Sequence, residues 1–219
     1  MKILGISTSS NVATVCLSND LEIIKELNIN NTKTHSETLV PLIQTLLEET
    51  NTKLQDIELL ACDIGPGSFT GIRIGIATIK AISQSLNIPI VDVTSLEALA
   101  YDVPNANIIC SIIDARNNQV YMALFDSKYN LLENYFADDI NNLLNVLNKY
   151  KDITFVGDGA IINKDLLSSN ICSSPEIHAK NINKCAYNKF KNGIFKNADN
   201  LSPMYLRKSQ AERMKDLNG

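Results

Sequence analysis

The chain has 219 residues, of which 45% are hydrophobic and 20% are charged, and its formal net charge is −4. This length suits one large or two small globular domains, and the composition excludes a disordered or fibrous chain. No apolar run reaches the ~20 residues that span a bilayer, and the segment after Met1 predicts a strand instead of a secretory signal, so we expect a cytoplasmic protein without membrane contact.

The cysteines and histidines argue against metal and redox sites. The five cysteines show no Cys-x-x-Cys spacing and most have apolar neighbours, so we expect buried, reduced thiols. The two histidines, His35 and His178, lie far apart and form no HExxH pattern. The sequence therefore predicts no metal ligand set.

The first half of the chain predicts an antiparallel start followed by alternating helices and strands. Thr34 and Glu37 have the spacing of a capping box at the start of a helix, and Pro41 should bend that helix or cause a local loss of hydrogen bonding. Strands are expected at 2–7, 13–17, 21–29, 57–64 and 88–93, and helices at 36–49, 71–86 and 95–101.

The second half repeats this plan. Strands are expected at 108–114, 119–126, 131–136 and 153–156, and helices at 139–150 and 181–195. The order strand-strand-strand-helix-strand-helix occurs twice in the chain. This repeat predicts two related α/β domains that meet at a cleft. We place these domains at 1–103 and 104–219.

A glycine-rich loop joins the predicted strand 57–64 to the following helix. Its defining residues are Gly65, Pro66, Gly67, Ser68 and Thr70. Such a loop can point backbone amides at an anion. It is no Walker A loop, because no Lys-Ser/Thr pair follows its last glycine. A tight turn that allows close packing is the favoured alternative.

The two long helices of the first half are candidates for a partner interface. Gly71 and Gly75 share one helix face, and each glycine in a helix costs ~1 kcal/mol against alanine. Packing within the domain or against a partner protein should offset this cost, and core packing alone would explain most of the apolar residues. The candidate interface residues are His35, Glu37, Leu39, Leu42, Ile43, Leu46, Gly71, Ile72, Arg73, Gly75, Ile76 and Ile79.

Three stretches carry a specific resemblance: ILGISTSSNVATVCL, THSETLVPLIQTLL and, above all, GPGSFTGIRIGIATIKAISQSLNIPIVDVTSLEALA. In these stretches the chain resembles the TsaB (YeaZ) family, accessory subunits of the machinery that makes N6-threonylcarbamoyladenosine at position 37 of tRNA. IDARNNQVYMALF, FVGDGA and PMYLRKSQAE match the family more loosely. The resemblance implies two related actin-like (ASKHA, RNase H-like) domains.

The resemblance also implies that the subunit lacks catalytic chemistry. TsaB resembles its partner TsaD, which binds a metal and transfers the threonylcarbamoyl group, and Ser95 and Leu99 stand where the metal ligands would be. Leucine cannot ligate a metal, and a serine hydroxyl is a poor substitute for imidazole. The loop after the first strand also offers no carboxylate for Mg²⁺. The candidate nucleotide relic comprises Ser7, Thr8, Gly157, Asp158 and Gly159.

The partners follow from the same resemblance. The helices 36–49 and 71–86 would dock on a TsaD-type transferase, and a TsaE-type ATPase would bind the pair. The isolated subunit would form a homodimer over much the same surface, and tRNA would be met mainly through the complex. No cofactor is expected on this subunit alone, whereas ATP and a metal are expected in the assembled complex.

Two other functions stay open at this point. An actin-like kinase or ATPase would need an acidic metal anchor, for which Asp63 and Asp158 are the candidates. A glycoprotease-type peptidase is disfavoured, because no HExxH, nucleophile elbow or Cys-His pair is evident.

The chain is basic towards its end. Residues 178–219 contain nine Lys/Arg and three Asp/Glu. This region, with Lys208 and Arg213, could contact tRNA, although a solvated basic helix and tail is the alternative without a specific function.

Overall fold

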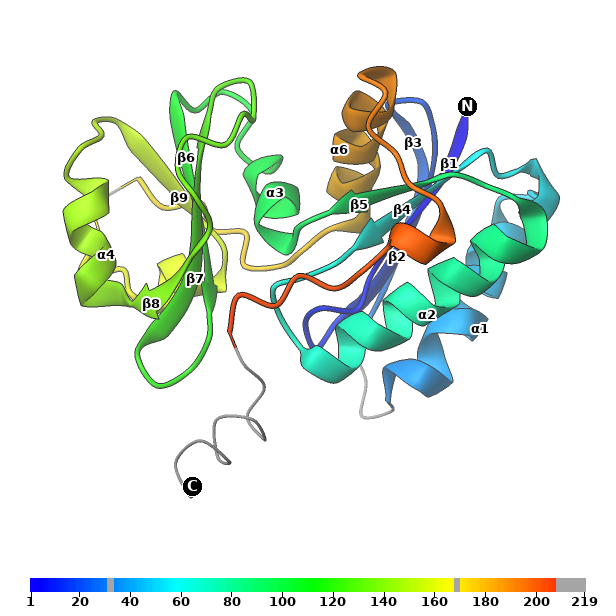
Figure 1. Ribbon diagram of the computed structural model, residues 1–219, viewed down its shortest axis with the longest axis horizontal. Coiled ribbons are helices and arrows are strands. Elements are labelled where there is room, and N and C mark those ends of the chain that lie inside the picture. The colour runs from blue at the N-terminus through cyan, green and yellow to red at the C-terminus, as the bar shows by residue number, and fades with distance from the viewer. Residues whose placement is uncertain (31–33, 168–169, 208–219) are drawn as a thin grey trace.

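The computed structural model describes residues 1–30, 34–167 and 170–207 and shows two sheets with helices around and between them (Figure 1). The strands are β1 (Lys2–Ser7), β2 (Ala13–Asn19), β3 (Glu22–Ile29), β4 (Leu59–Asp63), β5 (Ile90–Val93), β6 (Ile108–Asp114), β7 (Gln119–Asp126), β8 (Phe136–Asp139) and β9 (Ile153–Val156). The helices are α1 (His35–Glu49), α2 (Phe69–Leu86), α3 (Ser95–Ala100), α4 (Ile140–Leu147), α5 (Asp158–Ile162) and α6 (Ala179–Lys191), with 3-10 turns η1 (Leu54–Asp56) and η2 (Ala198–Asn200).

The two sheets repeat one topology. The first has the order β3-β2-β1-β4-β5 and the second the order β8-β7-β6-β9. In each, three antiparallel strands are followed by a strand parallel to the first of them, β4 beside β1 and β9 beside β6. This duplication agrees with the predicted pair of related α/β units.

Helices cover both faces of the first sheet, so its central strands are apolar on both sides. In β1, Leu4 and Ile6 pack in the core cluster under α1 and α2, whereas Ile3 packs in the cluster on the opposite face. That opposite face carries α6, and α3 packs against α6 as well as β6 and β7 of the second sheet. A third cluster lies between the second sheet and α4, where it includes Leu143 and Leu147.

The end of the chain returns to the first sheet, although the sequence assigns it to the second domain. Helix α6 packs on β1 and β2, where the buried Asn183 amide donates to Ile3 O at 3.1 Å and to Cys16 O at 3.2 Å. Lys196 then pairs with Ile90 at the edge of the sheet. Because this pairing is between residues far apart in sequence, local patterns could not indicate it.

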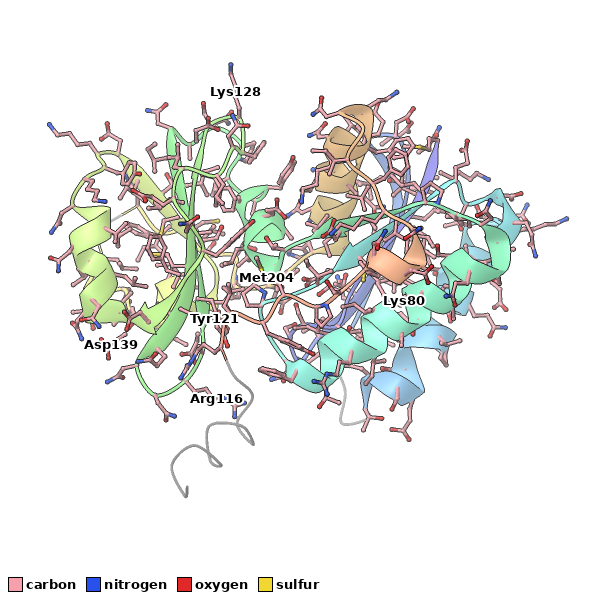
Figure 2. All side chains as sticks on the ribbon, viewed as in Figure 1. Lys80, Arg116, Tyr121, Lys128, Asp139 and Met204 are labelled. Atoms are coloured by element: carbon pink, nitrogen blue, oxygen red, sulfur yellow. The ribbon has the colours of Figure 1, made fainter. Side chains whose placement is uncertain are left out.

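After η2 the chain runs on between the two sheets, and Met204 lies there in Figure 2. Leu201 and Met204 pack in the core cluster under α1 and α2. Leu206 packs against the cluster that contains side chains of both sheets. The segment 201–207, called the C-terminal strap below, therefore joins the two halves of the molecule.

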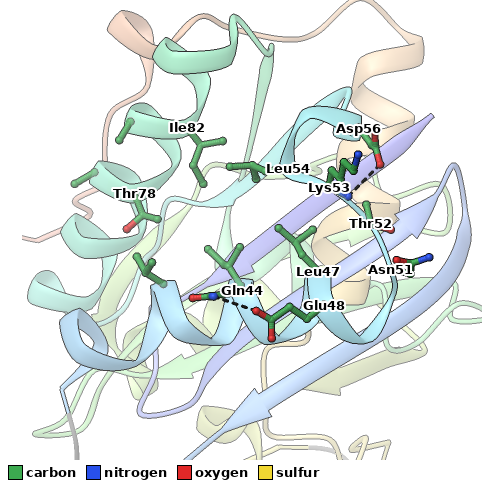
Figure 3. Close-up of a pocket in the computed structure, with 14 residues that line it drawn as sticks. Gln44, Leu47, Glu48, Asn51, Thr52, Lys53, Leu54, Asp56, Thr78 and Ile82 are labelled. Atoms are coloured by element: carbon green, nitrogen blue, oxygen red, sulfur yellow. Dashed lines mark hydrogen bonds between the residues drawn. The ribbon is translucent and has the colours of Figure 1, made fainter.

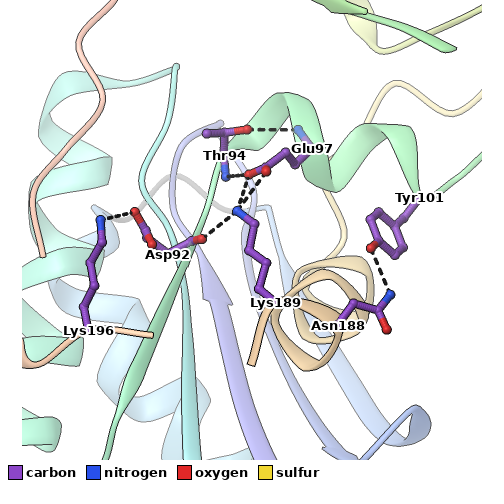
Figure 4. A network of polar contacts seen from close by, with 7 residues as sticks. All are labelled: Asp92, Thr94, Glu97, Tyr101, Asn188, Lys189 and Lys196. Carbon is purple, nitrogen blue, oxygen red and sulfur yellow. Dashed lines mark hydrogen bonds and ion pairs between the residues drawn. The ribbon is translucent and has the colours of Figure 1, made fainter. Parts of the chain in front are cut away.

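A polar network holds α3 against α6 and β5 (Figure 4). Lys189 Nζ lies 2.8 Å from Glu97 Oε1 and donates to Asp92 O at 3.0 Å. Lys196 Nζ lies 2.6 Å from Asp92 Oδ2. The Lys189–Glu97 pair links α6 to α3 and is partly removed from solvent, whereas the Lys196 side chain is 37% exposed.

Some sequence expectations differ from the structure. The strand predicted over 131–136 is wrong in its limits, because β8 spans Phe136–Asp139 and, before it, Leu131 forms an isolated bridge with Phe125. The short helix α5 was not expected, since Gly157-Asp158-Gly159 is typical of a loop. Helix α1 continues through Pro41.

The start of α1 uses only part of the predicted capping box. Glu37 Oε2 accepts from Thr34 N at 3.0 Å, as predicted. The Thr34 hydroxyl donates to the same carboxylate at 2.7 Å, whereas Glu37 N donates to the main-chain oxygen of Thr34. The carboxylate, with its negative charge at the helix N-terminus, therefore carries most of the cap.

The cysteines are unpaired, as predicted. Cys16, Cys62, Cys110 and Cys185 are buried, and Cys172 is partly buried. Burial raises the pKa of the Cys185 thiol to about 12, which keeps it protonated and unreactive. Within the described ranges, no helix is long and apolar enough to cross a bilayer.

An ion pair connects the start of α6 to the edge strand β3. His178 Nδ1 lies 3.5 Å from Glu26 Oε2, and Lys180 N donates to Glu26 Oε1 at 2.9 Å. The Glu26 carboxylate raises the pKa of His178 above its ordinary value, although burial acts against this. Burial opposes ionisation of Glu26, but its contacts with His178 and Lys180 together lower its pKa.

We expect His178→Gln to destabilise the protein at pH 6 and to have little effect at pH 9. A raised histidine pKa contributes stability that is complete below about pH 6.5 and is lost as the pH rises through the folded-state pKa. The loss at pH 6 should be about 0.5–1 kcal/mol, because the pair is partly exposed. Urea unfolding at both pH values measures it. A loss that is equal at both pH values would contradict the ion pair.

Candidate functional site

A buried polar cluster lies where β1 and β4 end and α3 begins. The Asp63 carboxylate accepts from Ser7 Oγ at 2.6 Å, Ser9 Oγ at 2.5 Å and Ser95 Oγ at 2.7 Å. Gly65 N adds a fourth hydrogen bond at 2.9 Å. We call Ser7, Ser9, Asp63 and Ser95 the strand-end cluster.

The strand-end cluster satisfies a carboxylate that water barely reaches. Asp63 is 2% exposed, and burial raises its pKa, while the four donors favour the ionised form and limit the shift. Both carboxylate oxygens are already hydrogen-bonded, so a cation at this position would have to displace the serine hydroxyls. In the part of the chain that the structure describes, no three His, Cys, Asp or Glu side chains come together as metal ligands.

The glycine loop packs against the turn that follows β1. Ser68 N donates to Ser9 O at 2.7 Å, and Gly71 N donates to the Ser68 hydroxyl at 3.2 Å. Gly65 has φ +97°, a conformation that favours glycine. A side chain at Gly67 would overlap Ser9 O. These amides donate hydrogen bonds to groups within the protein. This supports the interpretation of the loop as a tight turn rather than as an anion-binding loop.

The remaining loop residues differ in exposure. Pro66 is buried, whereas Ser68 and Thr70 are exposed at the start of α2. Ser68 is the N-cap of the helix. The loop thus starts α2 and holds it against β1.

The two glycines of α2 allow an approach within the domain. A β-carbon at Gly71 would overlap Thr8 O, and one at Gly75 would lie 2.5 Å from Thr8 Oγ1. The Thr8 hydroxyl donates to Gly71 O at 2.7 Å. Of the two explanations that the sequence leaves open for these glycines, the structure supports packing within the domain.

The second glycine pair has a similar packing role in the other half of the chain. Asp158 Oδ1 accepts from Asp114 N at 3.0 Å and from Gly159 N at 2.7 Å, and burial raises the pKa of its carboxyl. Gly157 has φ +103°, and a side chain there would overlap Ile112 O. The second-half residues of the candidate nucleotide relic, Gly157, Asp158 and Gly159, thus join α5 to β6.

Helix α3 connects the two loop regions. Ser95 is fully buried with its hydroxyl on Asp63, and Leu99 is 1% exposed in the core cluster between the sheets. A β-carbon at Gly157 would lie 2.9 Å from Leu99 Cδ1. Both positions that the family resemblance marks as altered are therefore occupied by side chains that hold the fold.

An open groove runs between α1 and α2 above the 3-10 turn η1 (Figure 3). Its volume is about 970 Å³. The lining residues are Val40, Ile43, Gln44, Leu47, Glu48, Asn51, Thr52, Lys53, Leu54, Asp56, Ala77, Thr78, Ala81 and Ile82. Val40 is 57% exposed. We call this surface the α1–α2 groove.

Most of the predicted interface side chains lie beneath this groove. The buried ones are Leu39, Leu42, Ile43, Leu46, Ile72, Ile76 and Ile79, all in the core cluster under the two helices. Of these, Ile43 alone lines the groove. His35 contacts Ser10 O through Nε2 at 2.8 Å, and Arg73 donates to Tyr205 Oη at 2.7 Å.

The surface residues of the groove were not singled out from the sequence. Val40, Gln44 and Leu47 have helical spacing, and so do Ala77 and Ala81. They border the more apolar stripe that enters the core. A second stripe of residues at helical spacing, less apolar than the buried stripe beside it, is the sequence signal that could have located the groove.

Comparisons with known proteins agree on the family. Residues 22–214 match the family model described as TsaD, tRNA N6-adenosine threonylcarbamoyltransferase. The chain is 34% identical over 172 residues to the tRNA threonylcarbamoyladenosine biosynthesis protein TsaB of Bacillus subtilis, covering 76% of this chain and 75% of that protein. The chain belongs to the TsaB (YeaZ) family.

Other TsaB relatives and solved structures are also similar. The Escherichia coli TsaB protein is 32% identical over 133 residues, covering 59% of this chain and 57% of that protein. The structure of YeaZ from Pseudomonas aeruginosa matches with a TM-score of 0.81 at 22% identity, over 94% of this chain and 99% of that one. This likeness confirms the predicted fold class.

We expect Gly75→Leu to destabilise the TsaB-type fold by about 1–3 kcal/mol, because the new side chain would overlap Thr8. Ala77→Leu is the matched control, since Ala77 is exposed on the same helix. Urea unfolding of both variants measures the difference. If Gly75→Leu is as stable as the control, the glycine is not required for packing in the monomer.

Proposed function

We propose that this chain is a non-catalytic subunit required to form the threonylcarbamoyl group on adenosine 37 of tRNAs that read codons beginning with adenine. Its relatives from Bacillus subtilis and Escherichia coli bear the name tRNA threonylcarbamoyladenosine biosynthesis protein TsaB. The subunit would act in the cytoplasm, as a scaffold for a TsaD-type transferase and a TsaE-type ATPase.

The observation that carries this proposal is the identity and burial of two side chains in α3, beside the end of β4. Ser95 and Leu99 occupy the positions that the resemblance assigns to metal ligands in the transferase, and both are buried as parts of the core. The Ser95 hydroxyl donates a hydrogen bond to Asp63, and leucine has no side-chain atom that can bind a metal. The transferase would therefore supply the chemistry, and ATP and the metal would be bound in the assembled complex.

The α1–α2 groove is the proposed docking surface for the transferase. It is concave and largely apolar, with few charged groups at its edge such as Glu48 and Lys53. Apolar grooves between helices are suited to an amphipathic helix of a partner. In isolation, a second copy of this chain would cover the same surface, and the ATPase would bind the assembled pair.

Depletion of this protein should remove threonylcarbamoyladenosine from total tRNA, and the intact chain should restore it. Digestion of the tRNA to nucleosides followed by mass spectrometry measures the modified nucleoside. Unchanged modification after complete depletion would contradict the proposal. ATP turnover by the purified chain, abolished by Asp158→Ala, would instead support the actin-like ATPase.

Ala81→Arg should weaken binding of the transferase by about tenfold or more, because it places a charge on the apolar wall of the groove. Ala81 is exposed, so the stability of the monomer should not change. Gln84→Arg is the control, since Gln84 is exposed on α2 outside the groove. Calorimetric titration with the purified transferase measures the affinity. Equal affinities for the two variants would exclude the groove as the docking surface.

A further inference from the structure

Phe69, Arg73 and Tyr205 form a stacked group where the C-terminal strap crosses the start of α2. The rings of Phe69 and Tyr205 are nearly parallel, with centroids 4.6 Å apart and an angle of 9°. Arg73 Nε donates to Tyr205 Oη at 2.7 Å, and its guanidinium carbon lies 5.6 Å from the Tyr205 ring centroid. We call these three residues the aromatic platform.

The aromatic platform remains accessible to solvent. Tyr205 is 40% exposed and Arg73 is exposed, whereas Phe69 is partly buried. The strap has other anchors, because Leu201 is buried and Met204 N donates to Ile64 O at 2.8 Å. The core contacts therefore hold the strap in place, and they leave the large ring of Tyr205 at the surface in a defined orientation.

The charge around the platform favours an anionic partner. Arg73 contacts Tyr205, and Arg207 is two residues from it in the chain, although the whole chain has a net charge of −4. Lys208 and Arg213, the basic residues noted in the sequence, lie outside the residues that the structure describes. Ser68 and Thr70 place exposed hydroxyls at the same end of α2. A partner that combines a flat face with negative charge fits this chemistry better than an apolar helix does.

We propose that the aromatic platform stacks an unpaired base of the tRNA, so that this subunit contacts the RNA directly. Unpaired bases stack on tyrosine, phenylalanine and arginine planes, and arginine also binds the adjoining phosphates. The proposal rests on the tRNA-modification function proposed above. It adds a binding surface to a subunit that otherwise acts through its partners.

Fluorescence anisotropy with the full-length chain tests the platform. The probes are a labelled single-stranded oligoribonucleotide of about 12 nucleotides and an unmodified tRNA transcript with adenosine at position 37. Tyr205→Leu should weaken binding of both by about tenfold, since each stacked base contributes substantially to affinity. Arg73→Gln should lower the slope of log K against log salt by about 0.7.

Matched controls come from a second tyrosine–cation pair. Lys191 Nζ lies 5.3 Å from the ring centroid of Tyr187 on α6. Tyr187→Leu and Lys191→Gln remove the same chemistry elsewhere and should leave RNA binding unchanged. Urea unfolding of each variant identifies any loss of folding. If Tyr205→Leu does not fold, the salt slope of Arg73→Gln decides the question.

The proposal would be overturned if the chain without substitutions bound neither probe, or if the platform variants bound RNA as tightly as that chain does. It would also be overturned if the control variants lost as much affinity as the platform variants. The threonylcarbamoyladenosine measurement separates this proposal from the function it rests on. Restoration by the intact chain, together with RNA binding that is insensitive to Tyr205, would overturn the platform alone. Platform-dependent RNA binding without restoration would overturn the proposed function alone.

Discussion

The buried carboxylate of Asp63 is the interaction on which the arrangement of the strand ends depends. A carboxylate that is 2% exposed must receive its hydrogen bonds from the protein. Its donors Ser7, Ser9 and Ser95 lie 56, 54 and 32 residues away in the sequence. One side chain therefore brings together the end of β1, the end of β4 and the start of α3, and the glycine loop begins on the same carboxylate through Gly65 N.

Helix α3 extends this constraint to the other half of the chain. Ser95 holds its first turn on Asp63, and Leu99 packs near Gly157 at the end of β9. The core cluster around α3 contains side chains from both sheets, including Val91 and Ile109. The region between the sheets is therefore filled by packed side chains near these loops.

Much of the fold could be predicted from the sequence, because its strands and helices have strong apolar periodicity. The limits of β1, β6, β7 and β9 are those expected from the pattern, and α1 and α2 begin within two residues of their predicted starts. That Ser95 and Leu99 offer poor metal ligands follows from their side chains alone and stays a prediction about function. The failures concern the limits of β8 and the presence of α5, whose first residues Asp158 and Gly159 are typical of a loop.

The sequence by itself determined the duplicated strand–helix order, the glycine turns and the family, because each depends on residues that are neighbours in the chain. Only the tertiary structure decided which apolar residues remain at the surface, and it buried Leu39 and Ile72 while leaving Val40 and Ala81 in the groove. It also decided that Gly75 faces Thr8 and that Tyr205 stacks on Phe69. These contacts join segments that are distant in sequence, and the burial of a side chain depends on which of those segments covers it.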